Sequence, residues 1–562
     1  MKALLVALNS QYIHSNLAIR YLRAYTKDMD YNCVLKEFTI NNRIEQVLEG
    51  IMEEKPDFIC FSTYIWNVDM VKALSHLIKR IDSKIEILYG GPEVSFDSEE
   101  FLKESNGDYL IKGEGEKAFR EFIEYKLKIR NINSIKGFYY SKNGEIFFNG
   151  NRENMDMNEI VFPYEECENL ENKIVYYEGS RGCPFRCKYC LSSTDRNLRF
   201  LNIERIKKEL QFFIDKKVKL VKFVDRTFNA NHDFAMAIWE YLIKNAKETS
   251  FHFEISADIL KKDEIELLKS APSGLFQFEV GVQSTNNTTL RHINRMVNFS
   301  SIEEKVVEIK NLQNIKQHLD LIAGLPGEDL SSFINSFNDV YSIEPEEIQL
   351  GFLKLLKGSN MRKEAGMWGM EYSPYPPYEI LRTSSISYEE LVILKRVEAM
   401  VDKYYNSGKF HNIIKYFINI FPNPFDFYLE LSKFFKHKGY FNRNISSTEY
   451  YKVFLDFNKE ILRRDNNSLK EIIKYDYLTY NKRSWVPDFI REDVNRDEID
   501  KVKEILKQDD VNINFSKVHI QKFNLDLELY IQENVLKKAE VYVIFYENKY
   551  KVKFITNIDK SF

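Results

Sequence analysis

Three cysteines within one short segment constrain this chain more than any other feature. They stand in the run Cys183-Pro184-Phe185-Arg186-Cys187-Lys188-Tyr189-Cys190, with the spacing C-x₃-C-x₂-C. Three thiolates on one loop can ligate three irons of a cubane [4Fe–4S] cluster and leave the fourth iron without a protein ligand. Because an open metal position is where a substrate or cofactor coordinates, the spacing predicts a reactive site rather than a structural one.

Two alternatives to a cluster fit the sequence less well. A structural zinc site needs a fourth ligand and usually a second C-x₂-C pair, whereas this chain has one pair, and the nearest spare candidates, Cys167 and His232, are not at a familiar spacing. A disulfide is disfavoured because 6 cysteines in 562 residues are sparse and no secretory signal is present. Residues 1–8 are too short for the apolar core of a signal peptide and are better explained as a buried first strand.

Charge and length limit the classes of partner and the number of domains. A net charge of −4 and an isoelectric point of about 6.2 give no reason to expect nucleic acid or an anionic membrane as a partner. No segment approaches the roughly 18 apolar residues of a membrane span. We therefore expect a soluble, cytoplasmic protein. At roughly 150 residues per domain the length predicts three or four domains, and we place three of them at residues 1–150, 165–370 and 375–562.

Residues 1–150 alternate short apolar runs with helical patterns. We expect strands at 3–8, 34–39, 58–62, 86–89 and 109–111, and helices at 17–26, 43–54, 68–81 and from 117 onward. This βαβ rhythm predicts an α/β domain with a doubly wound parallel sheet and helices on both faces. Ligands of such sheets lie beyond the carboxyl ends of the strands.

The sequence is most distinctive at those strand ends. They carry Ser62-Thr63-Tyr64, Gly90-Gly91-Pro92-Glu93 and Gly113-Glu114-Gly115. Glycine lets backbone amides approach a ligand closely, although each segment taken alone is equally well explained as a tight turn between strand and helix.

Together with their flanks, residues 61–67, 89–95 and 108–116, these segments resemble the cobalamin-binding domain that precedes the radical core in many radical S-adenosylmethionine (SAM) enzymes. The resemblance implies a Rossmann-like domain that binds cobalamin through Ser62, Thr63, Tyr64, Gly90, Gly91, Pro92, Glu93, Gly113 and Glu114. The chain departs from the family at one place. Domains that put a histidine on cobalt carry D-x-H-x-x-G after the first strand, where this chain has Asn9-Ser10-Gln11-Tyr12-Ile13-His14. We therefore expect no histidine on cobalt, with His14 a residue of the loop or helix start.

Residues 165–370 contain a second series of strands and helices. Strands are expected at 174–178, 220–224, 251–256, 277–282, 317–322 and 347–353, which predicts a partial (β/α)₆ TIM-like barrel with its chemistry at the carboxyl ends of the strands. Asp225, Glu254, Glu279, Gln283 and Asp320 lie at or near those ends. Any one of them is explained as a strand-end cap, but carboxylates in apolar strands are costly to bury unpaired, so their convergence favours a polar ligand.

Here a second resemblance becomes specific. Residues 178–182 with the cysteine run are similar to the signature of the radical SAM superfamily, and residues 279–284 and 319–328 are similar to later motifs of its coproporphyrinogen oxidase-like branch. The resemblance implies that Cys183, Cys187 and Cys190 ligate the cluster. It also implies that Glu254 and Arg295 hold the methionine part of SAM and that Gln283 and Asp320 hold its ribose. Tyr189 and Asp225 complete the implied SAM site, with a strand-end cap as the alternative for Asp225.

The last third of the chain carries no catalytic motif. A proline-rich segment at 372–378 is expected to mark a boundary, followed by helices such as 388–405 and 424–436 and by strand-like alternation at 527–531 and 540–552. The aromatic stripe of the helices is better explained as core than as a cofactor site. The arrangement resembles a cobalamin-type radical SAM family with an uncharacterised C-terminal extension, which we expect to be mainly helical and to face or cover the substrate.

The resemblances imply a radical SAM enzyme that generates a 5′-deoxyadenosyl radical with an electron from an external donor such as flavodoxin or ferredoxin. With cobalamin as methyl carrier, the reaction is methylation of an unactivated carbon in a small-molecule or peptide substrate. The alternative within enzymes is radical cyclisation, oxidation or rearrangement without methyl transfer. A cluster-bearing protein without catalytic activity is a third possibility. A methylthiotransferase is disfavoured because it needs three N-terminal cysteines, and only Cys33 and Cys60 lie in the first domain.

Overall fold

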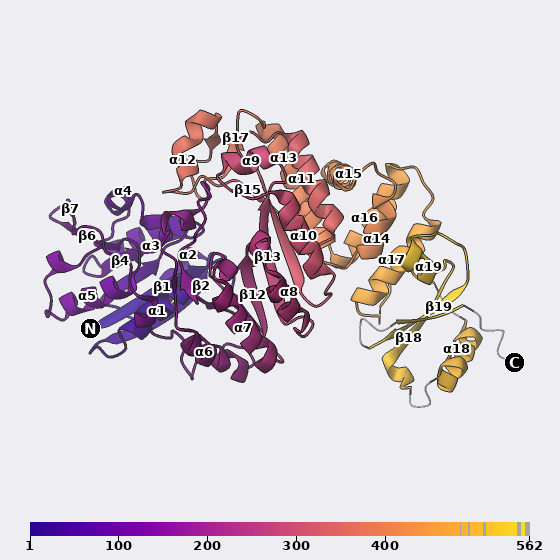
Figure 1. Ribbon diagram of the computed structural model, residues 1–562, viewed down its shortest axis with the longest axis horizontal. Coiled ribbons are helices and arrows are strands. Elements are labelled where there is room, and N and C mark those ends of the chain that lie inside the picture. Colours follow the sequence, from indigo (N-terminus) through magenta and orange to yellow (C-terminus); the bar gives the residue numbers. More distant parts are fainter. Residues whose placement is uncertain (484, 493–494, 510–512, 548–551, 557–562) are drawn as a thin grey trace. The chain divides into compact units, whose positions relative to one another are not determined.

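A computed structural model of the chain describes residues 1–483, 485–492, 495–509, 513–547 and 552–556. It divides into two compact units, the first formed by Met1–Ser336 and Leu350–Leu391, the second by Phe337–Gln349 and Val392–Phe562. The first unit contains two successive α/β parts, drawn from indigo to magenta in Figure 1. This α/β organisation with a mainly helical last part confirms the predicted fold class.

The N-terminal part is built on a seven-stranded sheet with the order β2-β1-β3-β4-β5-β6-β7. Its first five strands are parallel, and β6 and β7 add an antiparallel edge that the sequence did not predict. The strands are β1 (Lys2–Asn9), β2 (Asn32–Thr39), β3 (Phe58–Ser62), β4 (Glu86–Gly90), β5 (Tyr109–Ile111), β6 (Phe138–Lys142) and β7 (Glu145–Phe148).

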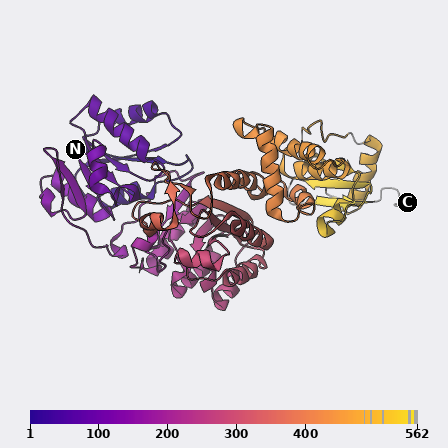
Figure 2. The same cartoon turned by 90° about the horizontal axis from the view of Figure 1, so that it is seen from above.

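Helices cover both faces of this sheet, as Figures 1 and 2 show. They are α1 (Leu17–Tyr25), α2 (Ile44–Met52), α3 (Val68–Ile81), α4 (Ser98–Glu104) and α5 (Glu116–Lys126). Alternate residues of β1 enter different cores, because neighbouring side chains of a strand point to opposite faces. Leu4 and Val6 pack with α2, α3 and α4, whereas Ala3 and Leu5 pack with α1 and α5. The sheet is thus buried on both sides, and a ligand can reach it only at the strand ends.

The central part is an open six-stranded barrel sheet with the order β15-β14-β13-β12-β11-β8, as predicted. Its strands are β8 (Ile174–Tyr177), β11 (Leu220–Phe223), β12 (Ser250–Ile255), β13 (Phe276–Gln283), β14 (Lys316–Ala323) and β15 (Glu347–Phe352). The intervening helices are α6 (Ile203–Asp215), α7 (His232–Asn245), α8 (Lys262–Lys269), α9 (Asn287–His292), α10 (Phe299–Lys310) and α11 (Leu330–Ile343). The strands β8, β11, β12, β13 and β14 pair in parallel, so their carboxyl ends share one rim.

The remaining elements of the first unit are short. They are β9 (Ser180–Arg181), β10 (Arg199–Phe200), α12 (Asn360–Glu364), β16 (Glu371–Tyr372) and β17 (Ile380–Arg382). The proline-rich segment 372–378 connects β16 to β17 in an antiparallel hairpin, and the compact unit continues beyond it to Leu391.

The second unit is mainly helical with a small antiparallel sheet, β18-β19-β20. Its elements are α13 (Tyr388–Met400), whose start belongs to the first unit, a π-helical turn (Val401–Asn406), α14 (His411–Ile418), α15 (Pro424–His437), α16 (Ser447–Glu460), α17 (Asn467–Tyr480), α18 (Arg496–Asp509), β18 (Val518–Phe523), α19 (Leu527–Glu533), β19 (Val541–Tyr546) and β20 (Val552–Ile555). The predicted strand at 527–531 is wrong, since this segment is helix α19. Of the predicted strand at 540–552, residues 548–551 lie outside the described part. No described helix combines the length and hydrophobicity needed to cross a bilayer.

Candidate functional site: a cysteine-lined cavity in the barrel

The cysteine loop follows β8 and β9 at the carboxyl rim of the barrel. Gly182, directly before Cys183, has φ +94°, and a Cβ there would lie 2.6 Å from the carbonyl oxygen of Asn197, so the loop entry requires glycine. Backbone bonds hold the loop, from the amide of Cys183 to the Asp195 carbonyl (3.1 Å) and from the amide of Lys188 to the Ile293 carbonyl (3.0 Å). The sequence therefore folds this loop into a fixed position on the rim.

A cavity of about 200 Å³ opens beside this loop. It brings together most of the residues that the sequence predicted for the cluster and for SAM, and these lining residues are Cys183, Cys187, Cys190, Tyr189, Glu254, Gln283, Arg295 and Asp320. The three cysteines are unpaired thiols, with Cys183 and Cys187 buried and Cys190 partly buried. Residues from five separate segments thus surround one space.

Among the described residues, three buried polar atoms on the cavity wall have no hydrogen-bond partner. They are Nε of Arg295, Oε1 of Gln283 and Oδ1 of Asp320. The guanidinium of Arg295 otherwise donates to the Gly281 carbonyl and lies 3.9 Å from the sulfur of Cys187. Unsatisfied buried donors and acceptors are rare and costly, so this wall fits a bound polar molecule that supplies the missing partners.

Two of the carboxyls that line the cavity, those of Glu254 and Asp320, are held in an environment that disfavours their charge. Burial raises the pKa of Glu254, although Arg226 opposes the shift. Burial and the neighbouring carboxylates Glu279 and Glu254 raise the pKa of Asp320 well above its ordinary value. A ligand that brings a positive charge, or hydroxyl groups that donate hydrogen bonds, would stabilise both carboxylates. SAM carries a sulfonium, an ammonium and a ribose, so the donor set fits it.

Asp225 does not line the cavity. It is fully buried and accepts hydrogen bonds from the Gly179 amide (2.9 Å) and the Ser180 hydroxyl (2.5 Å), which holds the segment that leads into the cysteine loop. The neighbouring residue Arg226 lines the cavity instead. Arg226 was not predicted, because a motif position favoured Asp225. Adjacent side chains of an extended chain point in opposite directions, so only one of the two can face the cavity.

The predicted cobalamin residues lie at the carboxyl ends of β3, β4 and β5. Gly91 has φ +119°, and a Cβ there would lie 2.3 Å from the carbonyl oxygen of Thr63, so two strand ends approach each other closely. A Cβ on Gly90 or Gly113 would meet nothing within 4 Å. Their backbone therefore faces open space, which fits the contact surface that a large flat ligand such as a corrin needs.

The other predicted cobalamin residues differ in their environment. Ser62 and Thr63 are buried, Tyr64 stacks on Trp66 with ring centroids 4.4 Å apart, and Pro92 begins a short 3₁₀ helix. Glu93 is 6% exposed and accepts a hydrogen bond from the hydroxyl of Tyr378. The hydrogen bond between Tyr378 and Glu93 ties the glycine loop at residues 90–93 to the hairpin that follows the barrel.

The β5 strand end is joined to the cysteine loop by charges. Arg181, two residues before Cys183, pairs with Glu116 (2.5 Å) and Glu178 (3.0 Å). Glu114 pairs with Arg199 (2.7 Å) and accepts from the Met155 amide (2.8 Å). Glu114 lies in the loop after β5 and Glu116 begins α5, so a buried ionic network connects the predicted cobalamin edge to the predicted cluster loop.

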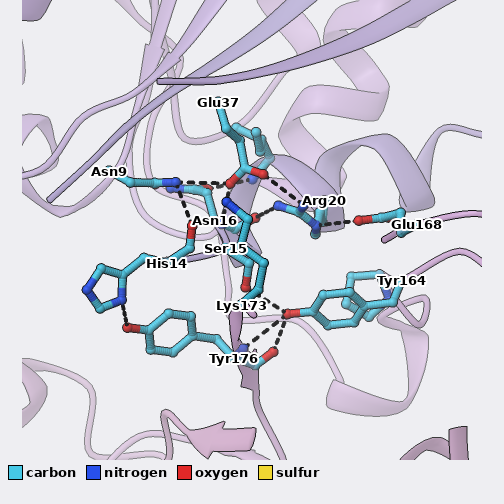
Figure 3. A network of polar contacts seen from close by, with 12 residues as sticks. Asn9, His14, Ser15, Asn16, Arg20, Glu37, Tyr164, Glu168, Lys173 and Tyr176 are labelled. Atoms are coloured by element: carbon cyan, nitrogen blue, oxygen red, sulfur yellow. Dashed lines mark hydrogen bonds and ion pairs between the residues drawn. The ribbon is translucent and has the colours of Figure 1, made fainter. Parts of the chain in front are cut away.

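His14 is engaged with the barrel. Its Nδ1 lies 2.6 Å from the hydroxyl of Tyr176 on β8, and residue 14 forms a parallel bridge with Ile174. Figure 3 shows the imidazole directed at Tyr176, below the network of Asn9, Asn16, Arg20 and Glu37. The loop after β1 thus lies along the edge strand of the barrel. This contact supports the expectation that His14 belongs to the loop structure.

Comparison with known families matches all three parts of the chain. Residues 3–123 match the B12 binding domain, and residues 177–340 match the radical SAM superfamily. The chain contains a B12-binding domain and a radical SAM domain. Residues 366–545 match a family described as a protein of unknown function, DUF4080. These matches confirm the predicted family and its cofactors, a [4Fe–4S] cluster, SAM and cobalamin.

Similar proteins include two curated sequences and one solved structure. An uncharacterized methyltransferase of Pyrococcus horikoshii is 22% identical over 327 residues, which cover 56% of this chain and 70% of that protein. The cobalamin-dependent radical SAM methyltransferase TokK of Streptomyces tokunonensis is 24% identical over 317 residues, 52% of this chain and 45% of TokK. The chain therefore matches less than half of TokK's length. The cobalamin-dependent SAM radical enzyme OxsB, with aqua-cobalamin and SAM bound, aligns with a TM-score of 0.58 at 16% identity, over 86% of this chain and 73% of OxsB, which shows a shared fold.

Proposed function

We propose that this protein is a cobalamin-dependent radical SAM methyltransferase acting on an unactivated carbon. The observation that carries the proposal is one barrel cavity lined both by the three cysteines and by Glu254, Gln283, Arg295 and Asp320. The radical SAM and B12-binding matches support it, as do two similar proteins that are named as methyltransferases.

Cys183, Cys187 and Cys190 would hold the cluster. A bound [4Fe–4S] cluster supplies an open iron for SAM and the electron that splits SAM into methionine and a 5′-deoxyadenosyl radical. Arg295, a fixed guanidinium beside Cys187, would bind the carboxylate of SAM. Glu254 would accept from the ammonium, and Gln283 and Asp320 would accept from the ribose hydroxyls. The cavity walls would hold SAM in one orientation and exclude water from the radical.

Cobalamin would lie against the strand ends of the N-terminal sheet. Bound cobalamin supplies a methyl group to the substrate. The open backbone at Gly90 and Gly113 would face the corrin. The ionic network around Arg181 would fix this edge relative to the cysteine loop. An external one-electron donor such as flavodoxin or ferredoxin would reduce the cluster.

Product analysis with and without cobalamin tests methyl transfer. The protein is reconstituted anaerobically with iron and sulfide and incubated with SAM and a reductant, with or without hydroxocobalamin. Loss of the methyl group yields S-adenosylhomocysteine, whereas radical formation yields 5′-deoxyadenosine. We expect both products with cobalamin and only 5′-deoxyadenosine without it. Formation of 5′-deoxyadenosine alone in both reactions, by a protein that retains no corrinoid, would favour cyclisation, oxidation or rearrangement instead.

A further inference from the structure

A layer of polar side chains lies next to the cofactor cavity inside the barrel. His252 on β12, Glu279 on β13 and His318 on β14 each stand two residues before a residue of the cavity lining, namely Glu254, Gly281 and Asp320. Because residues two apart on a strand share a face, these three side chains point into the same interior. Barrel interiors are ordinarily filled by branched apolar side chains. Packing alone therefore does not explain three polar side chains in this layer.

The three side chains converge on one point. Each offers one possible metal-ligand atom, and these atoms lie within 4.8 Å of one another. Nε2 of His252 is 3.3 Å from Oε2 of Glu279. His252 is 8% exposed, and its Nδ1 is buried without a hydrogen-bond partner. The geometry is close to that of a first coordination shell and leaves one polar atom unsatisfied.

The three residue types suit metal binding. Two imidazoles and one carboxyl group form a donor set typical of Zn²⁺, Mn²⁺ and Fe²⁺.

One neighbouring cation opposes this site. Nζ of Lys222 lies 3.1 Å from Oε2 of Glu279. Its side chain is 29% exposed, and a lysine stem is flexible, so the ammonium can turn toward solvent when another cation binds. Lys222 therefore weakens the site without blocking it. Removal of Lys222 should raise metal affinity, whereas removal of a ligand should lower it.

We propose that His252, Glu279 and His318 bind a divalent transition-metal ion that is separate from the cluster held by the cysteines. The ion would lie beside the cofactor cavity, because Glu279 also lines that cavity. The proposal does not depend on methyl transfer, and its failure would leave the radical SAM assignment unchanged.

Mn²⁺ titration of the reconstituted protein tests the site. With the cluster in place the thiolates are occupied, and Mn²⁺ prefers nitrogen and oxygen ligands. The electron paramagnetic resonance signal of free Mn²⁺ then reports binding. We expect one Mn²⁺ per chain, with affinity lowered at least about tenfold in His318→Gln and in Glu279→Gln. Lys222→Met should bind Mn²⁺ more tightly than the natural protein.

A matched control removes a different histidine near carboxylates. His232 on α7 lies 3.0 Å from Asp263 and 3.5 Å from Glu264, outside the barrel interior. His232→Gln should leave Mn²⁺ affinity unchanged. The cluster absorption of each variant shows whether it has folded. Equal Mn²⁺ binding by His318→Gln and His232→Gln would overturn the proposal. Mn²⁺ binding by Lys222→Met but not by the natural protein would also overturn it, because the Lys222 ammonium would then be the cation that occupies the site.

Discussion

The buried carboxyl of Asp225 should control how firmly the cysteine loop is anchored. Asp225→Ala leaves the Gly179 amide and the Ser180 hydroxyl without acceptors, and both groups are buried. An unsatisfied buried polar group costs about 1–3 kcal/mol, so the two together should lower the free energy of local opening by about 2–6 kcal/mol. Hydrogen exchange of a peptide covering residues 174–182 measures this opening directly. Asp233→Ala, which removes an exposed carboxylate from the first turn of α7, should change local opening by less than about 0.5 kcal/mol.

The same residue predicts a dependence on pH. Burial raises the pKa of Asp225 to about 7, against about 3.9 in an unfolded chain. Between these values the folded protein binds a proton that the unfolded chain has lost, so stability falls as the pH rises from about 4 to about 7. The full effect is on the order of 4 kcal/mol. Asp225→Asn keeps one acceptor and cannot ionise.

The assay compares hydrogen exchange of the natural protein and of Asp225→Asn at the same pH. The intrinsic exchange rate, which itself depends on pH, then cancels from the difference in opening free energy. The opening free energy of the natural protein should decrease relative to the variant between pH 5.5 and pH 7.5. A difference that stays constant over this range, or that grows in favour of the natural protein as the pH rises, would refute the burial argument.

Four further substitutions test other parts of the site. Gly91→Ala should destabilise the first unit by about 1–3 kcal/mol in thermal unfolding, because its Cβ would meet the Thr63 carbonyl. Gly90→Ala should leave stability unchanged yet reduce corrinoid retention. Equal unfolding temperatures of the two variants would contradict the predicted difference in stability. Arg295→Gln should weaken SAM binding about 10- to 100-fold, the cost of about 1.5–3 kcal/mol for a charge-assisted bond, and an unchanged affinity in equilibrium dialysis would remove Arg295 from the site. Glu116→Gln should lower the midpoint of thermal unfolding, since it breaks a buried ion pair with the cysteine loop, and full retention of that midpoint would count against the network.

Most strands of the first unit could be predicted because each is a short apolar run that ends in a marked turn. β3 and β5 begin and end at the predicted residues, and β4 extends one residue further. The antiparallel pair β6 and β7 was missed since it forms the sheet edge, where β7 is only four residues long and largely exposed. Helix α19 was mistaken for a strand because Leu527, Leu529 and Ile531 alternate, and a seven-residue segment is too short to reveal a helical period.

The site could be predicted where it follows from topology. Parallel strands bring their carboxyl ends to one rim, so Glu254, Gln283 and Asp320 had to converge near the cysteine loop. The direction of side chains beyond a strand end does not follow from topology, which is why Arg226 rather than Asp225 faces the cavity. Contacts between distant segments, such as Glu93 with Tyr378, leave no local pattern in the sequence.

Reductive cleavage of SAM tests the central claim most directly. The reconstituted natural protein and its Cys187→Ala variant are each incubated anaerobically with SAM and a strong reductant, and 5′-deoxyadenosine is quantified. We expect 5′-deoxyadenosine from the natural protein and none above background from Cys187→Ala, because the two cysteines that remain cannot hold a cluster that leaves one iron open to SAM. Undiminished cleavage by Cys187→Ala, or no cleavage by natural protein carrying a full cluster, would contradict it.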